Sequence, residues 1–338
     1  GATAADIASE FSSENAIDDI ILLDPPTSQM VHEAVANLAD HGTLNLVIDH
    51  ALDAAVAVDM SKLHYQHLAL LGCRGPEIAA AYGQTRNRAD LRPDGVAWIV
   101  GAGGTMGRMH IQRALEMLNG PATIIATNRG EARLNRLIED YAELAAANGR
   151  ELVAFSPRLE PSRMQAEVDR LTAGRGVDDA IVLVPDPAVV DDVLPYLAPD
   201  GLLSIFAGVQ AGNLIDLPLD HAALYGAQFT GTSGSTVADQ LRVLEKIQNR
   251  TLSASQCVAA IGGMQAMRDG LRAVLEQQYA GKVVIFPQLR DLPWMSLAEL
   301  EDVLPDVYAQ LAPGPVWTAE AERTLIEAYW QPAEEEIG

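Results

Sequence analysis

Short apolar runs alternate with segments of helical periodicity along most of this chain. A run of about four to eight apolar residues between turn residues predicts a buried strand, and apolar residues three and four positions apart predict a helix. The most regular part contains expected strands at 96–101, 122–127, 151–155, 180–184, 202–206 and 227–231. Strands that alternate with helices predict an α/β fold with a doubly wound parallel sheet.

Further elements are expected on both sides of this part. Before it lie expected strands at Ile17–Leu23, Thr43–Ile48 and 67–72, a helix at Met30–Leu38, and the end of a helix at Asp6–Phe11. After it, a helix is expected around Met267–Gln278 and a strand at Gly281–Phe286. Residues 291–338 contain helical stretches interrupted by prolines, and we expect them to pack against the core or a neighbour.

The early strands and the later ones have similar sequences. Ile17–Asp24 matches Val177–Val184, Leu38–Leu44 matches Leu197–Leu203, and Leu70–Gly75 matches Phe229–Gly234, at an offset of 160 residues that becomes 159. Matches at a nearly constant offset indicate an internal repeat. In the second copy the matched piece is the back half of a dinucleotide-binding fold, so the first copy is expected to be a partial half-unit.

The chain is therefore expected to have three parts. Residues 1–90 form a partial Rossmann-like half-unit, which we expect to be truncated upstream because its front half has no counterpart in the sequence. Residues 91–290 form a complete Rossmann domain, and residues 291–338 form a helical tail.

A glycine-rich turn follows the strand at 96–101 and precedes a segment of helical character, Arg108–Leu118. Its sequence is Gly101-Ala-Gly-Gly-Thr-Met-Gly107, with glycines at 101, 104 and 107. Glycines allow the backbone to turn tightly and approach a pyrophosphate, and a helix N-terminus supplies free N–H groups. We expect a nucleotide here, with the N–H groups of Thr105 and Met106 facing its phosphates. The alternatives are a tight corner without a ligand and a methyltransferase.

Several strings together resemble the cofactor domain of the medium-chain dehydrogenase/reductase family over about residues 85–290. They are Val100–Gly107, Thr127–Arg129, Gly174–Asp179, Leu197–Gly201 and Gly281–Ile285. Residues 106–115 are similar to the zinc-type alcohol dehydrogenase-like and sorbose-1-phosphate-reductase-like branch. The resemblance implies an NAD(P)-dependent oxidoreductase acting on an alcohol or carbonyl compound, such as a polyol or sugar phosphate. Those enzymes also carry a barrel-like catalytic domain, which we do not find here, so we expect a fragment of such an enzyme.

The resemblance also implies which residues contact the cofactor. The expected set is Gly101, Gly104, Thr105, Met106, Gly107, Asn128, Arg129, Arg133, Val184, Pro185, Ala207, Gly208, Val209, Thr232 and Ser233. Asn128 stands where NAD-preferring proteins often place an acid for the ribose hydroxyls. Because it is neutral and Arg129 and Arg133 follow, NADP is favoured over NAD. The alternative is that both are ordinary surface arginines.

Candidates for acid–base chemistry are few. His110 lies one turn into the helix after the glycine turn, and His64 and Tyr65 could donate a proton to a carbonyl oxygen. The alternative for each is a structural role. The pairs at 18–19 and 178–179 are adjacent aspartates before strands, which we expect to be solvated turn residues or caps.

Composition limits the partners. The 338-residue chain has a net charge of −23, which opposes nucleic acid and anionic membranes as partners. It has two cysteines and no set of residues with zinc-ligand spacing, so no metal is expected, and no signal peptide is found, so we expect the cytoplasm. We expect a homodimer that binds a small-molecule substrate. A non-catalytic nucleotide-binding or dimerisation module is the alternative function.

Overall fold

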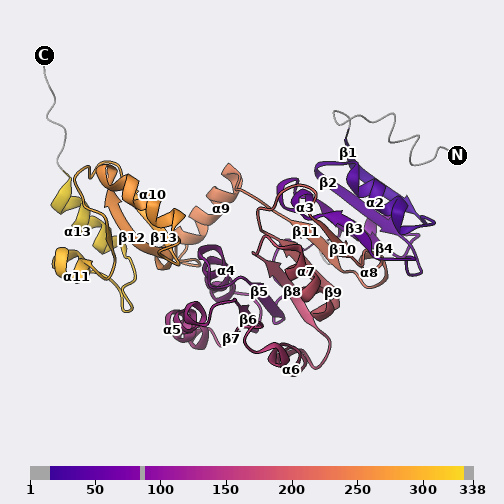
Figure 1. Cartoon of the computed structure of the whole chain (residues 1–338), viewed down its shortest axis with the longest axis horizontal. Coiled ribbons are helices and arrows are strands. Elements are labelled where there is room, and N and C mark those ends of the chain that lie inside the picture. Colours follow the sequence, from indigo (N-terminus) through magenta and orange to yellow (C-terminus); the bar gives the residue numbers. More distant parts are fainter. Residues whose placement is uncertain (1–15, 84–87, 331–338) are drawn as a thin grey trace, which may run out of the picture. The chain divides into compact units, whose positions relative to one another are not determined.

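A computed structural model describes residues 16–83 and 88–330 of the chain. The helix end expected at Asp6–Phe11 lies outside the described residues. Contacts between Cα atoms divide the chain into two compact units (Figure 1). Of the described residues, the first unit contains 16–83, 88–102 and 114–240, and the second contains 103–113 and 241–330.

The first unit is built on a nine-stranded sheet with the order β1-β2-β4-β11-β9-β8-β5-β6-β7. Six of its strands are β5 (Val96–Val100), β6 (Thr123–Thr127), β7 (Glu151–Phe155), β8 (Val177–Val182), β9 (Leu197–Ile205) and β11 (Gln228–Gly231). All neighbouring pairs among these six are parallel. The connecting helices include α5 (Glu131–Ala147), α6 (Pro161–Thr172), α7 (Pro187–Val193) and α8 (Asp220–Leu224). The predicted doubly wound sheet is confirmed, because the chain winds outward from β5 in one direction to β7 and in the other to β11.

The same sheet continues into an N-terminal segment, residues 17–73. Its elements are β1 (Ile17–Leu23), α2 (Ser28–Ala36), β2 (Leu38–Val47), β3 (Val56–Asp59), α3 (Met60–Tyr65) and β4 (Ala69–Cys73). Strands β1, β2 and β4 are parallel to one another. The order of elements in this segment is also that of β8, α7, β9, β10 (Leu214–Leu217), α8 and β11. The internal repeat itself stays a prediction.

The N-terminal segment joins the rest of the sheet through an antiparallel pair. Leu70 of β4 lies opposite Phe229 of β11, and β3 pairs antiparallel with β10. A Cβ atom at Gly231 would collide with the carbonyl oxygen of Leu63 in α3, and one at Gly72 would collide with the backbone of Ala223 in α8. Each short helix therefore lies against the last strand of the other segment, at a position where only glycine leaves room.

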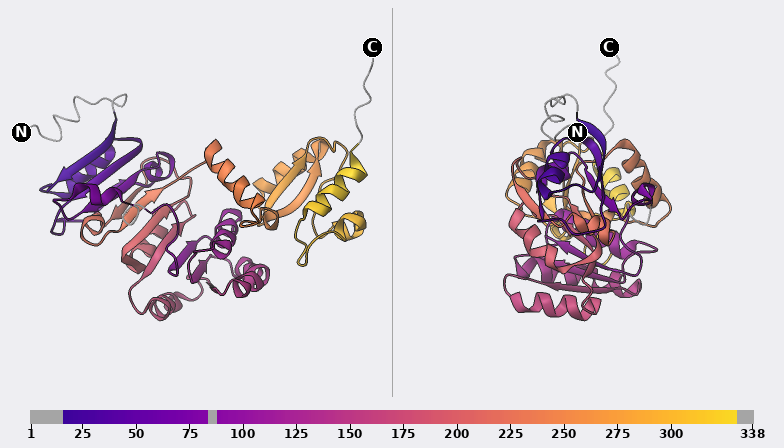
Figure 2. Two further views of the ribbon diagram at one scale, coloured as in Figure 1. Left: turned by 180° about the vertical axis from the view of Figure 1, so that it is seen from behind. Right: turned by 90° about the vertical axis from the view of Figure 1, so that its right-hand side faces the viewer.

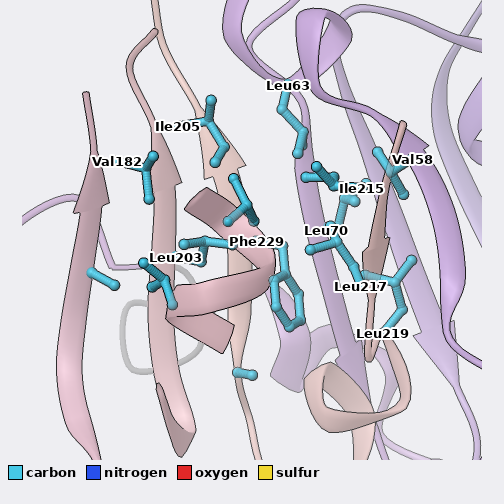
Figure 3. Packing of buried hydrophobic residues seen from close by; sticks show 14 of the residues in the cluster. Val58, Leu63, Leu70, Val182, Leu203, Ile205, Ile215, Leu217, Leu219 and Phe229 are labelled. Carbon is cyan, nitrogen blue, oxygen red and sulfur yellow. The ribbon is translucent and has the colours of Figure 1, made fainter. Parts of the chain in front are cut away.

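The core of this unit crosses the junction. Figure 3 shows Leu70 of the N-terminal segment beside Phe229, with Leu63 farther up in the view and side chains of β9 and β10 on either side. Phe229 is 1 % exposed and Leu70 is also 1 % exposed. Burial of such side chains contributes roughly 1.5–3 kcal/mol each. The antiparallel pairing of β4 with β11, the antiparallel joint of this sheet, is therefore stabilised by a shared apolar core as well as by backbone hydrogen bonds.

The adjacent aspartates at 178 and 179 correct one expectation. They are not solvated caps but buried members of β8, paired with arginines from the segment before β5. Asp178 accepts a hydrogen bond from the backbone N–H of Val96, and Asp179 pairs with Arg88. Carboxylates taken out of water need such partners. The other pair, Asp18 and Asp19, is exposed but lies within β1.

The second unit has its own small sheet, made of β12 (Val258–Gly263), β13 (Lys282–Phe286) and β14 (Met295–Ser296). Strand β13 was predicted, but it pairs with β12 here and is not part of the nine-stranded sheet. The helices of this region are α10 (Met267–Leu275), α11 (Leu300–Val303), α12 (Pro305–Tyr308) and α13 (Ala319–Tyr329), drawn in orange and yellow in Figure 2. Trp317 and Leu325 of the tail pack with Ile261 and Phe286 of this sheet, so the tail completes the core of this unit.

Two helices lie at the division between the units, α4 (Thr105–Glu116) and α9 (Val237–Gln248). None of the helices in the described ranges is long and apolar enough to span a bilayer. Likewise, no group of three or more His, Cys, Asp or Glu side chains there could hold a metal ion.

Candidate functional site

The candidate site lies at the carboxyl edge, where the parallel strands β5, β6, β8, β9 and β11 end. Strand β5 pairs with β6 on one side and with β8 on the other, and the chain leaves in opposite directions at this point. In open α/β sheets ligands bind in the crevice at such a switch point. The predicted cofactor residues of the first unit follow the ends of these strands, so the sheet order brings their loops into one row.

Gly101 makes the turn that leaves β5. Its φ is +89°, a left-handed conformation that favours glycine, and an added Cβ would lie 2.9 Å from the Cγ2 atom of Val184. The N–H groups of Gly101 and Ala102 both donate to the carbonyl oxygen of Thr127, at 2.9 and 3.0 Å. These two groups hold the corner itself, so a phosphate would have to be bound further along the turn.

The next groups along the turn belong to the start of α4 and to the second unit. Thr105, Met106 and Gly107 are the first residues of α4, where N–H groups have no partner within the helix. The Thr105 hydroxyl lies 3.4 Å from the carbonyl oxygen of Gly281, which also belongs to the second unit. The helix start therefore has the chemistry of an anion site.

Asn128, Arg129 and Arg133 follow β6. Asn128 is half-buried and its Nδ2 atom donates to the carbonyl oxygen of Gly130 at 3.3 Å, which holds the side chain near the turn. Arg129 and Arg133 are exposed. Two exposed guanidinium groups beside a neutral amide favour binding of a phosphate over binding of free ribose hydroxyls.

The remaining cofactor candidates lie on three loops that backbone hydrogen bonds tie to neighbouring strands. The N–H of Leu183 donates to Val100, that of Phe206 to Val182, and that of Thr232 to Ile205, at 2.9 to 3.1 Å. The loops continue as Val184–Pro185, Ala207–Val209 and Thr232–Ser233. Ala207 and Val209 are buried, whereas Pro185, Gly208 and Thr232 are exposed and can face a ligand.

The structure brings His64 and Tyr65 to this edge. Their rings are 4.5 Å apart in an edge-on arrangement, and His64 makes a second edge-on contact, at 5.6 Å, with Phe206. A Cβ added to Gly208 would lie 2.8 Å from the Tyr65 hydroxyl oxygen. The catalytic candidates His64 and Tyr65 of the N-terminal segment thus lie beside the predicted cofactor loop at 207–209.

Sequence reasoning missed two neighbours of this pair, His67 and His41. Their rings are stacked with centroids 4.7 Å apart, and the Nε2 atom of His67 lies 3.5 Å from the Ser233 hydroxyl. No local signal could have placed them here, because their position depends on β4 running antiparallel to β11.

Burial decides the charge state of His64. The side chain is 6 % exposed, and loss of solvation lowers its pKa, although the backbones of Thr232 and Ile205 act in the opposite direction. The Nδ1 atom is buried and has no hydrogen-bond partner within the described parts of the chain. At neutral pH the ring is therefore a neutral imidazole.

His110 has a different setting, in the second unit. Its Nδ1 atom lies 2.8 Å from the carbonyl oxygen of Met106, one turn earlier in α4. Burial lowers its pKa. A neutral ring that donates to its own helix fits the structural alternative.

Comparison with known proteins gives relatives in sequence but no match to a family model. The chain is 27 % identical over 239 residues to L-sorbose 1-phosphate reductase of Klebsiella pneumoniae, which covers 70 % of the chain and 56 % of that protein. It is 28 % identical over 184 residues to the uncharacterized protein YggP of Escherichia coli (strain K12), covering 54 % and 43 %. The chain thus spans about half the length of the curated relatives it matches.

Solved structures of alcohol dehydrogenases are also similar to this chain. That of Aeropyrum pernix has a TM-score of 0.43 and 24 % identity, covering 60 % of this chain and 54 % of the other. The enzyme TADH from Thermus sp. ATN1 has a TM-score of 0.44 and 21 % identity, covering 62 % and 57 %. Both TM-scores are below 0.5.

Proposed function

We propose that this chain is an oxidoreductase that transfers hydride between NADP, or NAD, and an alcohol or carbonyl compound such as a polyol or sugar phosphate. The observation that carries the proposal is Gly101, a left-handed glycine at the switch point of a doubly wound sheet. Similarity to L-sorbose 1-phosphate reductase supports the same reaction class.

The residues fit a dinucleotide at each part of the edge. A side chain at Gly101 would collide with Val184, so glycine is required for the tight turn that leads from β5 to the proposed phosphate site further along the chain. Within the first unit, Arg129 and Arg133 would bind the 2′-phosphate of NADP. The loops at 184–185, 207–209 and 232–233 would bind the nicotinamide. When bound, the cofactor supplies or accepts the hydride.

The chain's own residues would then orient the bound cofactor and shield it from water. The buried residues Ala207 and Val209 hold the loop that carries exposed Gly208, so the backbone at Gly208 can face a ligand without mobile side chains. The neutral ring of His64 and the contacts of Phe206 exclude water from one side of this loop. Exclusion of water strengthens electrostatic interactions at the reacting atoms.

A non-catalytic module is the second candidate. In that case the edge would bind nucleotide without turnover. The expected homodimer belongs to both candidates and can be checked by sedimentation equilibrium with and without nucleotide.

Titration with NADPH and with NADH, followed by nicotinamide fluorescence, tests the proposal. We expect saturable binding with NADPH tighter. Gly101→Ala should weaken binding at least tenfold, because the methyl group collides with Val184 and the left-handed turn is strained. Gly174→Ala is the matched control, since Gly174 has a φ of +77° with nothing within 4 Å of its Cβ position. A folded chain that binds neither nucleotide would overturn the proposal.

A further inference from the structure

The antiparallel joint brings a second group of side chains to the carboxyl edge. Because β4 runs opposite to β11, with Ala69 across from Thr230, the residues before β4 lie beside the residues after β11. The residues before β4 are α3 and its continuation to His67, and the residues after β11 are Thr232 and Ser233. The N-terminal segment thus lies along one side of the carboxyl edge, and the cofactor loops form the rest of this edge.

Among these residues of the N-terminal segment, Tyr65 can reach a ligand. Its side chain is 54 % exposed, and its hydroxyl approaches Gly208 so closely that a single methyl group there would touch it. Gly208 is exposed and lies on a predicted nicotinamide loop. A phenolic hydroxyl can donate a hydrogen bond to a carbonyl oxygen and accept one from an alcohol, so one group serves both directions of an alcohol–carbonyl reaction.

His64 holds Tyr65 in place. The imidazole is almost fully buried and makes edge-on contacts with Tyr65 on one side and with Phe206 on the other. Its unpartnered Nδ1 atom is a buried polar group, which costs free energy unless a ligand or water satisfies it. The close approach of Leu63 to Gly231 fixes the helix that carries both residues.

We propose that Tyr65 is a binding residue of the N-terminal segment that hydrogen-bonds the reacting oxygen of an alcohol or carbonyl substrate beside the cofactor, with His64 as its positioning residue. This inference rests on the proposed function. It implies that the segment completes the substrate side of the site rather than serving only as a continuation of the sheet.

The chain contains a matched control for this pair. His221 and Tyr225 also make an edge-on contact, with centroids 5.1 Å apart, and Tyr225 is 51 % exposed. They belong to α8 and its C-cap, which lies against β4, where the Arg74 side chain donates to the carbonyl oxygen of Leu224. Tyr225 therefore has a similar ring environment away from the cofactor loops.

The first test detects proximity to the cofactor without activity. The full chain is labelled with 3-fluorotyrosine, and the fluorine resonances of Tyr65 and Tyr225 are assigned from Tyr65→Phe and Tyr225→Phe. NADPH should shift the Tyr65 resonance and leave that of Tyr225 unchanged, and Gly208→Ala should shift Tyr65 in the free chain. If NADPH binds by nicotinamide fluorescence but the Tyr65 resonance does not move, the inference is overturned and the proposed function stands. If NADPH does not bind, both fail.

The second test measures the hydrogen bond through NADPH oxidation with L-sorbose 1-phosphate, the substrate named for the relative. Tyr65→Phe should lower kcat/KM about tenfold, which is the cost of one lost hydrogen bond in a desolvated site, while the Kd for NADPH stays within about twofold. Tyr225→Phe should match the wild type. A kcat/KM of Tyr65→Phe equal to that of the wild type would contradict the inference. If the wild-type chain does not turn over this compound, the fluorine shift of the first test decides whether the inference holds.

Discussion

The Nη1 atom of Arg88 lies 2.6 Å from the Oδ1 atom of Asp179, whose side chain is completely buried. The other carboxylate oxygen accepts a hydrogen bond from the backbone N–H of Arg92 at 2.7 Å, and the backbone N–H of Arg88 donates to the Gln228 side chain. The pair therefore ties the segment that enters β5 to β8 and to the base of β11. It fixes the segment that enters β5 against the strands that carry the candidate site.

Removal of the Arg88 charge should lower the free energy of unfolding. Arg88→Met leaves the Asp179 carboxylate buried without its cation, and such losses reduce the free energy of unfolding by about 3–5 kcal/mol. Urea unfolding followed by circular dichroism measures the change. Arg170→Met is the control, because Arg170 pairs with Glu151 and Glu167 at the surface and its loss should leave the stability close to that of the wild type. Equal effects of the two substitutions would contradict a structural role for the buried pair.

Acid should destabilise the fold partly through His64 and His110. Burial lowers the pKa of both rings below the ordinary value of 6.5, so the unfolded chain takes up their protons first as the pH falls. Their contribution to the free energy of unfolding is present above about pH 6.5. It is lost as the pH falls toward the lowered pKa values of the folded chain. The free energy of unfolding then changes by at most about 1.4 kcal/mol per pH unit for each proton.

Urea unfolding at pH 7.5, 6.5 and 5.5 checks this. His110→Gln should have a shallower dependence on pH than the wild type over this range, since carboxylate effects are common to both chains. A slope that does not change in either His110→Gln or His64→Gln would show that the rings titrate normally in the folded chain.

The preference for NADPH should depend on Arg129. Arg129→Ala removes a cation beside Asn128 and is expected to raise the Kd for NADPH about tenfold, as expected for loss of one charge-assisted hydrogen bond, with the Kd for NADH unchanged. Arg136→Ala is the matched control, because Arg136 is also exposed and lies farther along α5. A similar loss of affinity for both nucleotides would show that Arg129 does not distinguish the 2′-phosphate.

Phe229 should be among the most sensitive apolar positions. It is fully buried where the two segments meet, so Phe229→Ala is expected to lower the free energy of unfolding by about 3–5 kcal/mol. Leu118→Ala provides the comparison, since Leu118 is 91 % exposed and its loss should change stability by less than about 0.5 kcal/mol. If Phe229→Ala gives two separate transitions, the N-terminal segment unfolds independently of the remaining strands.

The elements that could be predicted from sequence are those specified locally. Strand β5 is a continuous apolar run, and the glycine turn after it has a composition that fixes its conformation. The strands β3 and β10 were missed; each has four residues, and they pair with each other in a sheet of two strands outside the large sheet. Strand β12 was also missed, whereas β13 was predicted as a strand without its partner.

The environment of charged and aromatic side chains depended on distant partners. Asp179 looks solvated in sequence because its partner Arg88 lies 91 residues earlier, in the segment that enters β5. The position of Tyr65 beside Gly208 could not be predicted, since it requires the antiparallel joint between β4 and β11. The identity of the cofactor residues remains a prediction that the binding experiments address.

The joint between β4 and β11 also determines where this sheet can accept a strand from another molecule. With β9 on one side and β4 on the other, β11 has no unpaired backbone edge, and the described sheet ends at β1 and β7. Both end strands carry exposed acids, Asp18 and Asp19 on β1 and Glu151 on β7. Charges on edge strands oppose intermolecular pairing and aggregation. Pairing of this nine-stranded sheet with a second molecule at β1 or β7 is therefore disfavoured.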